Sequence, residues 1–254
     1  MTRSDRRWII LLSIAMVVVA GIVYAVNFAI FRDSRNIWFY MFIDIAFLPI
    51  EVLVVGVIVE RLLSRRDKRA LEHKMNMVIG TFYGEMGTEL LTRLLPAVKD
   101  APQVKEGLHL QPAWSKADFA RAHTFVTQAH CDVEVDRVDL PALRDYLVEQ
   151  RHFLLRLLEN PNLMEHDRFT DLLWAVLHVE QELAARPSLD HLAPSDRAHL
   201  AFDLKRAYSH LLDEWLHYTE HLKDDYPYLF SLVCRTHPFQ ETPSAAIVDT
   251  PQAS

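Results

Sequence analysis

A chain of 254 residues has room for a membrane segment and one ordinary domain, because soluble domains cluster at roughly 100–200 residues. Its 27 basic and 34 acidic side chains give a net charge of −7, which argues against nucleic acid as a partner. Two cysteines, Cys131 and Cys234, are too few for a disulfide framework, and the scarcity of glycine and of β-branched alternation favours helices. The composition therefore predicts an all-α protein.

The first apolar stretch covers residues 8–31 and contains no ionisable side chain. Since about 20 apolar residues cross the hydrocarbon core of a bilayer, this stretch predicts a transmembrane helix. A second apolar stretch covers residues 37–59, and the short connector between them requires an antiparallel hairpin. A cleaved signal peptide is the alternative for the first stretch, although its apolar run exceeds the roughly 7–15 residues of such peptides.

Basic residues flank the predicted hairpin on the side of both ends. Three arginines precede the first span, and five basic residues follow the second: Arg61, Arg65, Arg66, Lys68 and Arg69. The positive-inside rule therefore predicts a multi-pass membrane protein with both termini in the cytoplasm. The same five side chains could hold anionic lipid head groups, which would make membrane lipid a partner, or they could act as a topology signal alone.

Two acidic residues interrupt the second span. Asp44 and Glu51 are seven residues apart and share one helix face, and an ionisable group at this depth costs at least about 2.5 kcal/mol. A symmetric hairpin places Tyr24 opposite Asp44 but leaves Glu51 without a polar partner. Glu51 could be protonated, pair across an oligomer, or line a polar pathway.

Small residues could let helices approach closely at two places: Gly21, Ala25 and Ala29 in the first span, and Gly80, Gly84 and Gly87 after the second. For the first group the alternatives are a helix-packing face and chance. For the second they are a dimer seam or moving joint, and packing against the chain's own later helices.

Beyond the spans, the absence of proline predicts a continuing helix, and a proline-rich loop then precedes further helical periodicity. We divide the chain into a membrane hairpin, a juxtamembrane stalk helix, a loop, a cytoplasmic helical bundle and a disordered tail, at residues 1–63, 64–98, 99–114, 115–237 and 238–254. Within the bundle, helices are expected near residues 115–130, 140–158, 164–186, 196–223 and 228–235. The aromatic segment 225–239 either closes the core or docks a partner.

Catalytic motifs are missing: the sequence has no phosphate-binding loop, paired-cysteine motif, His-Glu-x-x-His or Gly-x-Ser-x-Gly. Histidines and acids instead form a polar stripe over 199–221, at spacings of three or four residues. Combined with the preceding helix, they suggest a transition-metal site formed by His178, Glu182, Glu214, His217 and His221. The alternative is that these histidines lie at the core margin and bind neighbouring helices or water. No other cofactor is expected.

Four segments together resemble a group of uncharacterised bacterial two-span membrane proteins: residues 60–66 (ERLLSRR), 77–85 (MVIGTFYGE), 158–163 (LENPNL) and 226–232 (YPYLFSL). The resemblance covers most of the chain. It implies a bacterial cytoplasmic (inner) membrane, and it supplies no activity, cofactor or catalytic residue.

These observations favour a membrane-anchored helical interaction or regulatory module that is not an enzyme. We expect it to form a homo-oligomer and to bind lipid and a cytoplasmic protein partner. Two alternatives remain: an oligomeric ion or proton pathway that uses Asp44 and Glu51, and a metal-dependent enzyme built on the five metal ligands named above.

Overall fold

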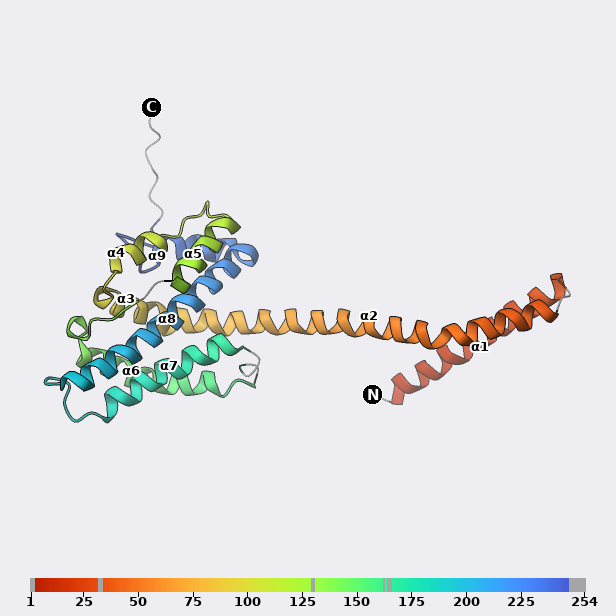
Figure 1. Ribbon diagram of the computed structural model, residues 1–254, viewed down its shortest axis with the longest axis horizontal. Helices are drawn as coiled ribbons and strands as arrows, with labels where there is room; N and C mark the ends of the chain where they lie inside the picture. The colour runs from red at the N-terminus through yellow and green to blue at the C-terminus, as the bar shows by residue number, and fades with distance from the viewer. Residues whose placement is uncertain (1–2, 32–33, 129–130, 162, 164–165, 247–254) are drawn as a thin grey trace, which may run out of the picture. The chain divides into compact units, whose positions relative to one another are not determined.

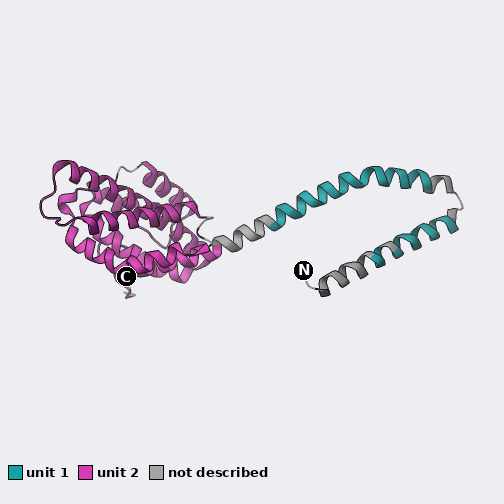
Figure 2. Cartoon of the chain, turned by 90° about the horizontal axis from the view of Figure 1, so that it is seen from below, with its two compact units in different colours: residues 1–68 teal, residues 69–254 magenta. Residues whose placement is uncertain are grey.

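The computed structural model describes residues 3–31, 34–128, 131–161, 163 and 166–246. These residues form helices and one isolated antiparallel bridge between Val98 and Val133, so the predicted all-α class is confirmed. The chain divides into two compact units, residues 1–68 and residues 69–254 (Figure 2). Helix α2 (Ser34–Phe82) contributes residues to both units.

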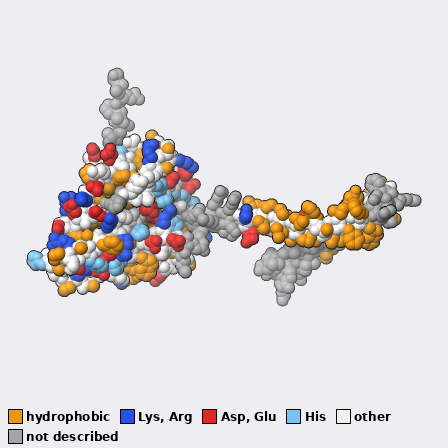
Figure 3. Space-filling model, in the orientation of Figure 1, with side chains coloured by type: hydrophobic (Ala, Val, Ile, Leu, Met, Phe, Trp, Pro, Cys, Tyr) orange, Lys and Arg blue, Asp and Glu red, His pale blue; other side chains and the backbone are white. Residues whose placement is uncertain are grey.

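Unit 1 contains α1 (Arg3–Phe31) and the first part of α2. Within the described residues, one helical segment, Trp38–Leu63, is long and apolar enough to cross a membrane. Its large hydrophobic side chains are exposed along its length, and Figure 3 shows them as a nearly continuous apolar surface. The apolar stretch in α1, Ile14–Ile30, is shorter. The span predicted for residues 8–31, and with it the hairpin, therefore stays a prediction.

Unit 2 is a helical bundle in which α8 (Pro194–Asp225) is the central helix (Figure 1). Helix α8 packs against several others, among them α3 (Thr88–Leu94), α5 (Lys116–Gln128), α7 (Asp167–Ala185) and α9 (Pro227–Thr236). Helix α6 (Leu140–Leu158) packs against α7. The five helices predicted between residues 115 and 237 are thereby confirmed. The core stripe of α8 follows helical spacing and includes Leu200, Leu204, Leu211, Trp215 and Leu222.

The segment predicted as a stalk enters this core. One stripe of buried side chains has a spacing of mostly four residues, and each member is 2% exposed or less: Met75, Ile79, Phe82, Met86, Leu90 and Leu94. Side chains with so little exposure are stabilised mainly by removal of apolar surface from water. The end of α2 therefore belongs to the folded domain.

A π-helix, η1 (Tyr83–Gly87), keeps this stripe facing the core. An α-helix turns about 100° per residue, so the 19 residue steps from Met75 to Leu94 would end about 100° beyond five full turns. A π-turn takes up about one residue more than an α-turn, which removes this excess. The backbone N–H of Thr88 accordingly bonds the carbonyl of Tyr83, five residues earlier.

Two segments differ from the predicted loop and tail. The predicted loop at 99–114 contains a short helix, α4 (Ala101–Gly107), and buries Leu108 and Leu110. Past residue 237, Phe239 is buried and its ring meets Trp215 edge-on at a centroid distance of 4.9 Å. The core of unit 2 therefore includes the first residues of the predicted tail.

Candidate functional site

The polar stripe of α8 meets the neighbouring helices at two separate places. Helices α7 and α8 run in opposite directions along each other, so that His178 of α7 faces Asp203 while Arg168, earlier in α7, faces Glu214. Asp203 and His217 are 14 residues apart, which is about 21 Å along a helix. The stripe therefore forms two polar groups and not one site.

The five ligands predicted from the sequence are divided by this arrangement. His178 and Glu182 lie beside the first half of α8, where Glu182 also approaches His199. Glu214 and His217 lie further along α8. His221 lies elsewhere again, 2.9 Å from the carboxylate of Asp225, and its ring is near Tyr226.

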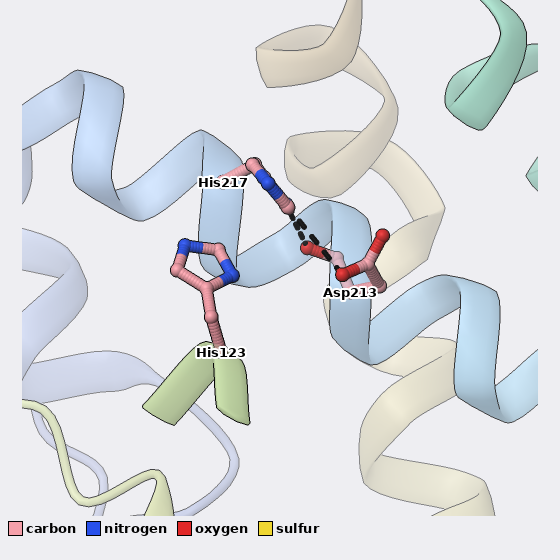
Figure 4. Close-up of side chains that lie close together, drawn as sticks. All are labelled: His123, Asp213 and His217. Carbon is pink, nitrogen blue, oxygen red and sulfur yellow. Dashed lines mark hydrogen bonds and ion pairs between the residues drawn. The ribbon is translucent and has the colours of Figure 1, made fainter. Parts of the chain in front are cut away.

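The group around His217 includes His123 of α5 and Asp213 of α8, whose ligand atoms lie within 4.8 Å of one another (Figure 4). The two imidazole rings are 4.1 Å apart between centroids. His217 Nδ1 is 2.8 Å from the carbonyl oxygen of Asp213, so this nitrogen donates a hydrogen bond and is not free to bind a metal. His123 Nε2 is 3.1 Å from Glu220, and burial lowers the pKa of His217. The histidines of this group therefore already use part of their hydrogen-bonding capacity on other residues of the protein.

Glu214 lies next to this group in an almost dry environment, with 2% of its surface exposed. Its carboxylate is 3.5 Å from Arg168 Nε and 3.9 Å from His166 Nε2, and one of its oxygens, Oε2, makes no hydrogen bond. Burial raises the pKa of Glu214 to about 7, and the charge of Arg168 opposes this effect only in part. Glu214 therefore titrates near neutral pH.

The second group joins α7 to α8 near the start of α8. Arg186 binds Asp196 through two nitrogen atoms, at 2.6 and 3.1 Å, and binds the carboxylate of Glu182 at 2.8 Å. The hydrogen bond from Arg186 lowers the pKa of Glu182, so this carboxylate is charged at neutral pH. His178 and His199 lie on either side of it, at 3.9 and 3.5 Å. Asp203 also belongs to this group, because its carboxylate lies 3.3 Å from both histidines.

A cleft of about 990 Å³ lies elsewhere on unit 2. It is lined by charged and aromatic side chains that include Lys105, Glu106, His109, Trp114, Arg121 and Phe125. Much of the lining comes from the segment that the sequence predicts to be a loop. Proline punctuation marks that segment as irregular without showing that it folds against α5, so the sequence gives no signal for this cleft.

The acidic and basic positions predicted for the membrane lie in α2. Asp44 and Glu51 are exposed and make no hydrogen bond or ion pair with any residue that the structure describes. Arg61 is exposed as well. The side chains of Arg65, Arg66, Lys68 and Arg69 fall outside the described part of the structure, so their role in lipid binding stays a prediction.

The small residues have different surroundings. Ala25 and Ala29 are exposed, and a Cβ built on Gly21 would meet no atom within 4 Å. At Gly80 a Cβ would lie 3.1 Å from the hydroxyl oxygen of Tyr218 in α8, which is packing against the chain's own later helix. Gly84 is open, and the space at Gly87 is occupied by aromatic side chains that precede it in the chain: Phe82 and Tyr83.

Among the described residues, the protein is an all-α bundle with paired histidines and carboxylates and with one helical segment long and apolar enough to cross a membrane, and this class indicates no activity. The chain belongs to the family of uncharacterized protein MJ1433. Residues 71–235 match the C-terminal helical domain of that family, and residues 3–63 match its N-terminal helical domain.

Uncharacterized protein MJ1433 of Methanocaldococcus jannaschii is 38% identical to this chain over 236 residues, which cover 93% of the chain and 95% of that protein. No solved structure matches. The uncharacterised status of the family agrees with the resemblance seen in the sequence. This relative is archaeal, so the bacterial membrane stays a prediction.

Proposed function

We propose that this protein is a membrane-anchored helical module that acts by binding or regulation and not by catalysis. The observation that carries the proposal is the composition of α2. Its segment Trp38–Leu63 is apolar and contains no buried residue, while Met75, Ile79 and Phe82 of the same helix lie in the core of unit 2. A single helix thus supplies a candidate anchor and part of a folded domain.

The length of this segment fits a bilayer. Its 26 residues extend about 39 Å at 1.5 Å per residue, which exceeds the roughly 30 Å of the hydrocarbon core. Apolar surface left in water costs about 25 cal/mol per Å², and side chains such as Phe42 and Leu53 are about two-thirds exposed. A bilayer would remove this cost along the whole helix.

The cysteines support a role without a cysteine nucleophile. Cys131 and Cys234 are both buried and unpaired, and burial raises the pKa of each thiol to about 11. The thiolate is the nucleophilic form of cysteine, so neither residue is an activated nucleophile at neutral pH.

The proposed topology has α1 as a second span, the connection between α1 and α2 outside, and unit 2 in the cytoplasm. In a chain with Cys131→Ala and Cys234→Ala, we expect Ser34→Cys to react with a membrane-impermeant maleimide in intact cells. Ser188→Cys, in an exposed loop of unit 2, should react only after the cells are opened. Reaction of Ser188→Cys in intact cells would contradict this orientation, and recovery of the protein in the soluble fraction would contradict anchoring altogether.

Homo-oligomerisation is part of the proposal, since a Cβ built on Gly21 would meet no atom of the described residues within 4 Å, which leaves this face of α1 open to a second copy. Mass photometry of the full chain in lipid nanodiscs measures the number of copies per particle. Strict monomers, together with failure to recover a partner after cross-linking in cells, would reject the interaction role.

A further inference from the structure

We propose that unit 2 binds a divalent transition-metal ion between α7 and α8, through His178 and Glu182 of α7 and His199 and Asp203 of α8. The proposal is independent of the membrane anchor. It keeps two of the ligands predicted from the sequence and replaces the other three with His199 and Asp203.

The two helices contribute the same pattern. Each carries a histidine followed four residues later by a carboxylate, which places both side chains on one helix face. Because α7 and α8 run in opposite directions, His178 lies beside Asp203 and Glu182 lies beside His199. Four ligand side chains therefore converge from two facing helices, as in metal sites built within helical bundles.

The ligand atoms of His178, Glu182 and His199 lie within 4.8 Å of one another, and Asp203 approaches both histidines. Asp203 Oδ2 is 3.3 Å from the Nε2 atoms of both His178 and His199. Glu182 oxygens lie 3.9 Å from His178 Nε2 and 3.5 Å from His199 Nε2. Ligands about 2.1 Å from a zinc ion in tetrahedral geometry are about 3.4 Å apart, so the four histidine–carboxylate distances are close to those that an ion requires.

Asp203 supplies independent support. Its surface is 2% exposed, yet its Oδ2 atom makes no hydrogen bond, although this atom lies between the two histidine nitrogens. Arg206 lies 3.3 Å from the other oxygen, Oδ1. A buried carboxylate oxygen without a hydrogen bond is costly, and a bound cation would compensate it.

Neighbouring side chains hold the ligands in place. Arg186 binds Glu182 Oε2 and is itself fixed by Asp196, while Arg206 holds Asp203. Such outer contacts orient metal ligands and commonly affect affinity. The histidines are partly open, with side chains 38% exposed at His178 and 51% exposed at His199, so an ion can reach the site from solvent.

The donor atoms select the kind of metal. Two imidazole nitrogens with two carboxylates suit first-row ions such as Zn²⁺, whereas Ca²⁺ and Mg²⁺ prefer oxygen ligands alone. The rival explanation is that protonated histidines neutralise the two carboxylates without any metal.

The test uses the full chain, purified without a histidine tag and stripped with a chelator, and titrates it with Zn²⁺ against a chromophoric competitor. We expect about one competing Zn²⁺ site per chain. His199→Ala and His178→Ala should weaken this site at least tenfold, since outer-shell changes alone cost about 10–100-fold. The control His152→Ala changes an exposed histidine of α6 and should bind as the wild type does.

The His217→Ala variant separates this site from the group around His217. Loss of binding in His217→Ala with retention in His199→Ala would overturn the proposal, as would wild-type protein without a site or an equal loss in the His152→Ala control. Far-UV circular dichroism checks folding. If His178→Ala is unfolded, the zinc affinity of His199→Ala decides the test, because the His199 side chain is half exposed and its removal should leave the fold intact. Visible absorption of bound Co²⁺ then reports whether the coordination is tetrahedral.

Discussion

At Glu214 a carboxyl group is almost fully buried beside Arg168 and His166. Burial raises its pKa to about 7 from an ordinary value of 4.5. Between these two pH values the folded state therefore binds more protons than the unfolded state, and this residue makes the protein less stable as the pH rises. The full effect is present above about pH 7 and absent below about pH 4.5.

Replacement of this carboxyl by an amide should remove the pH dependence. Each pKa unit is worth about 1.4 kcal/mol, so we expect Glu214→Gln to gain up to about 3 kcal/mol relative to wild type between pH 4.5 and pH 8. Urea unfolding at both pH values measures the difference. The control Glu149→Gln alters an exposed carboxylate of α6 and should show no such gain. An equal response of both variants would refute a buried, protonated Glu214.

The sequence indicated which residue types carry the chemistry of unit 2 but not which residues meet. His178 and Glu182 were identified from their spacing on one helix, and His199 and Asp203 lie in the polar stripe predicted for the next. Grouping them requires the register between α7 and α8, which depends on packing of the whole core. The sequence pattern therefore combined His178 with His217, which the structure places on a different part of α8.

At the level of elements, the three glycines near the end of α2 separate into different environments. Gly80 adjoins Tyr218, whose ring stacks on Tyr83 at 5.5 Å, whereas Gly84 faces open space. Their spacing in the sequence predicts that these glycines share one face, and that prediction holds only for an unbroken α-helix. The π-helix was not foreseen, since it arises from the packing of the stripe from Met75 to Leu94 and has no sequence marker.

Alanine substitutions at Gly80 and Gly84 form a matched pair. Gly84→Ala should stabilise unit 2 by up to about 1 kcal/mol, because alanine loses less backbone entropy on folding. Gly80→Ala gains the same backbone-entropy contribution but must displace the Tyr218 ring. We therefore expect it to be at least about 1 kcal/mol less stable than Gly84→Ala. Thermal unfolding of both variants compares them. Equal stability would show that the Gly80 contact is loose.

For the whole molecule, the hydrophobic core of the described residues begins at Met75 and ends at Phe239. Helix spacing and capping signals located α5 to α9 from the sequence. The sequence does not show that residues 75–98 belong to the core, since a helix that continues from a membrane span has the same pattern whether or not its end is buried.

A polypeptide of residues 69–254 should therefore fold alone. We expect it to be soluble, helical by circular dichroism and cooperative in unfolding, because its core includes no described residue of unit 1. A polypeptide that starts at residue 88 lacks Met75, Ile79 and Phe82 and should be unfolded or aggregated. Folding of the shorter polypeptide would contradict the role given to the end of α2.

The π-helix at Tyr83–Gly87 also constrains how chain length can vary among members of this family. It accommodates one residue more than an α-helix would, and the four-residue spacing of the buried stripe depends on that residue. A relative that lacks one residue here would turn the side chains before the gap by about 100° from those after it. We expect the apolar positions before the gap in such a relative to be shifted along the sequence. The deletion and the shift should therefore occur in the same relatives.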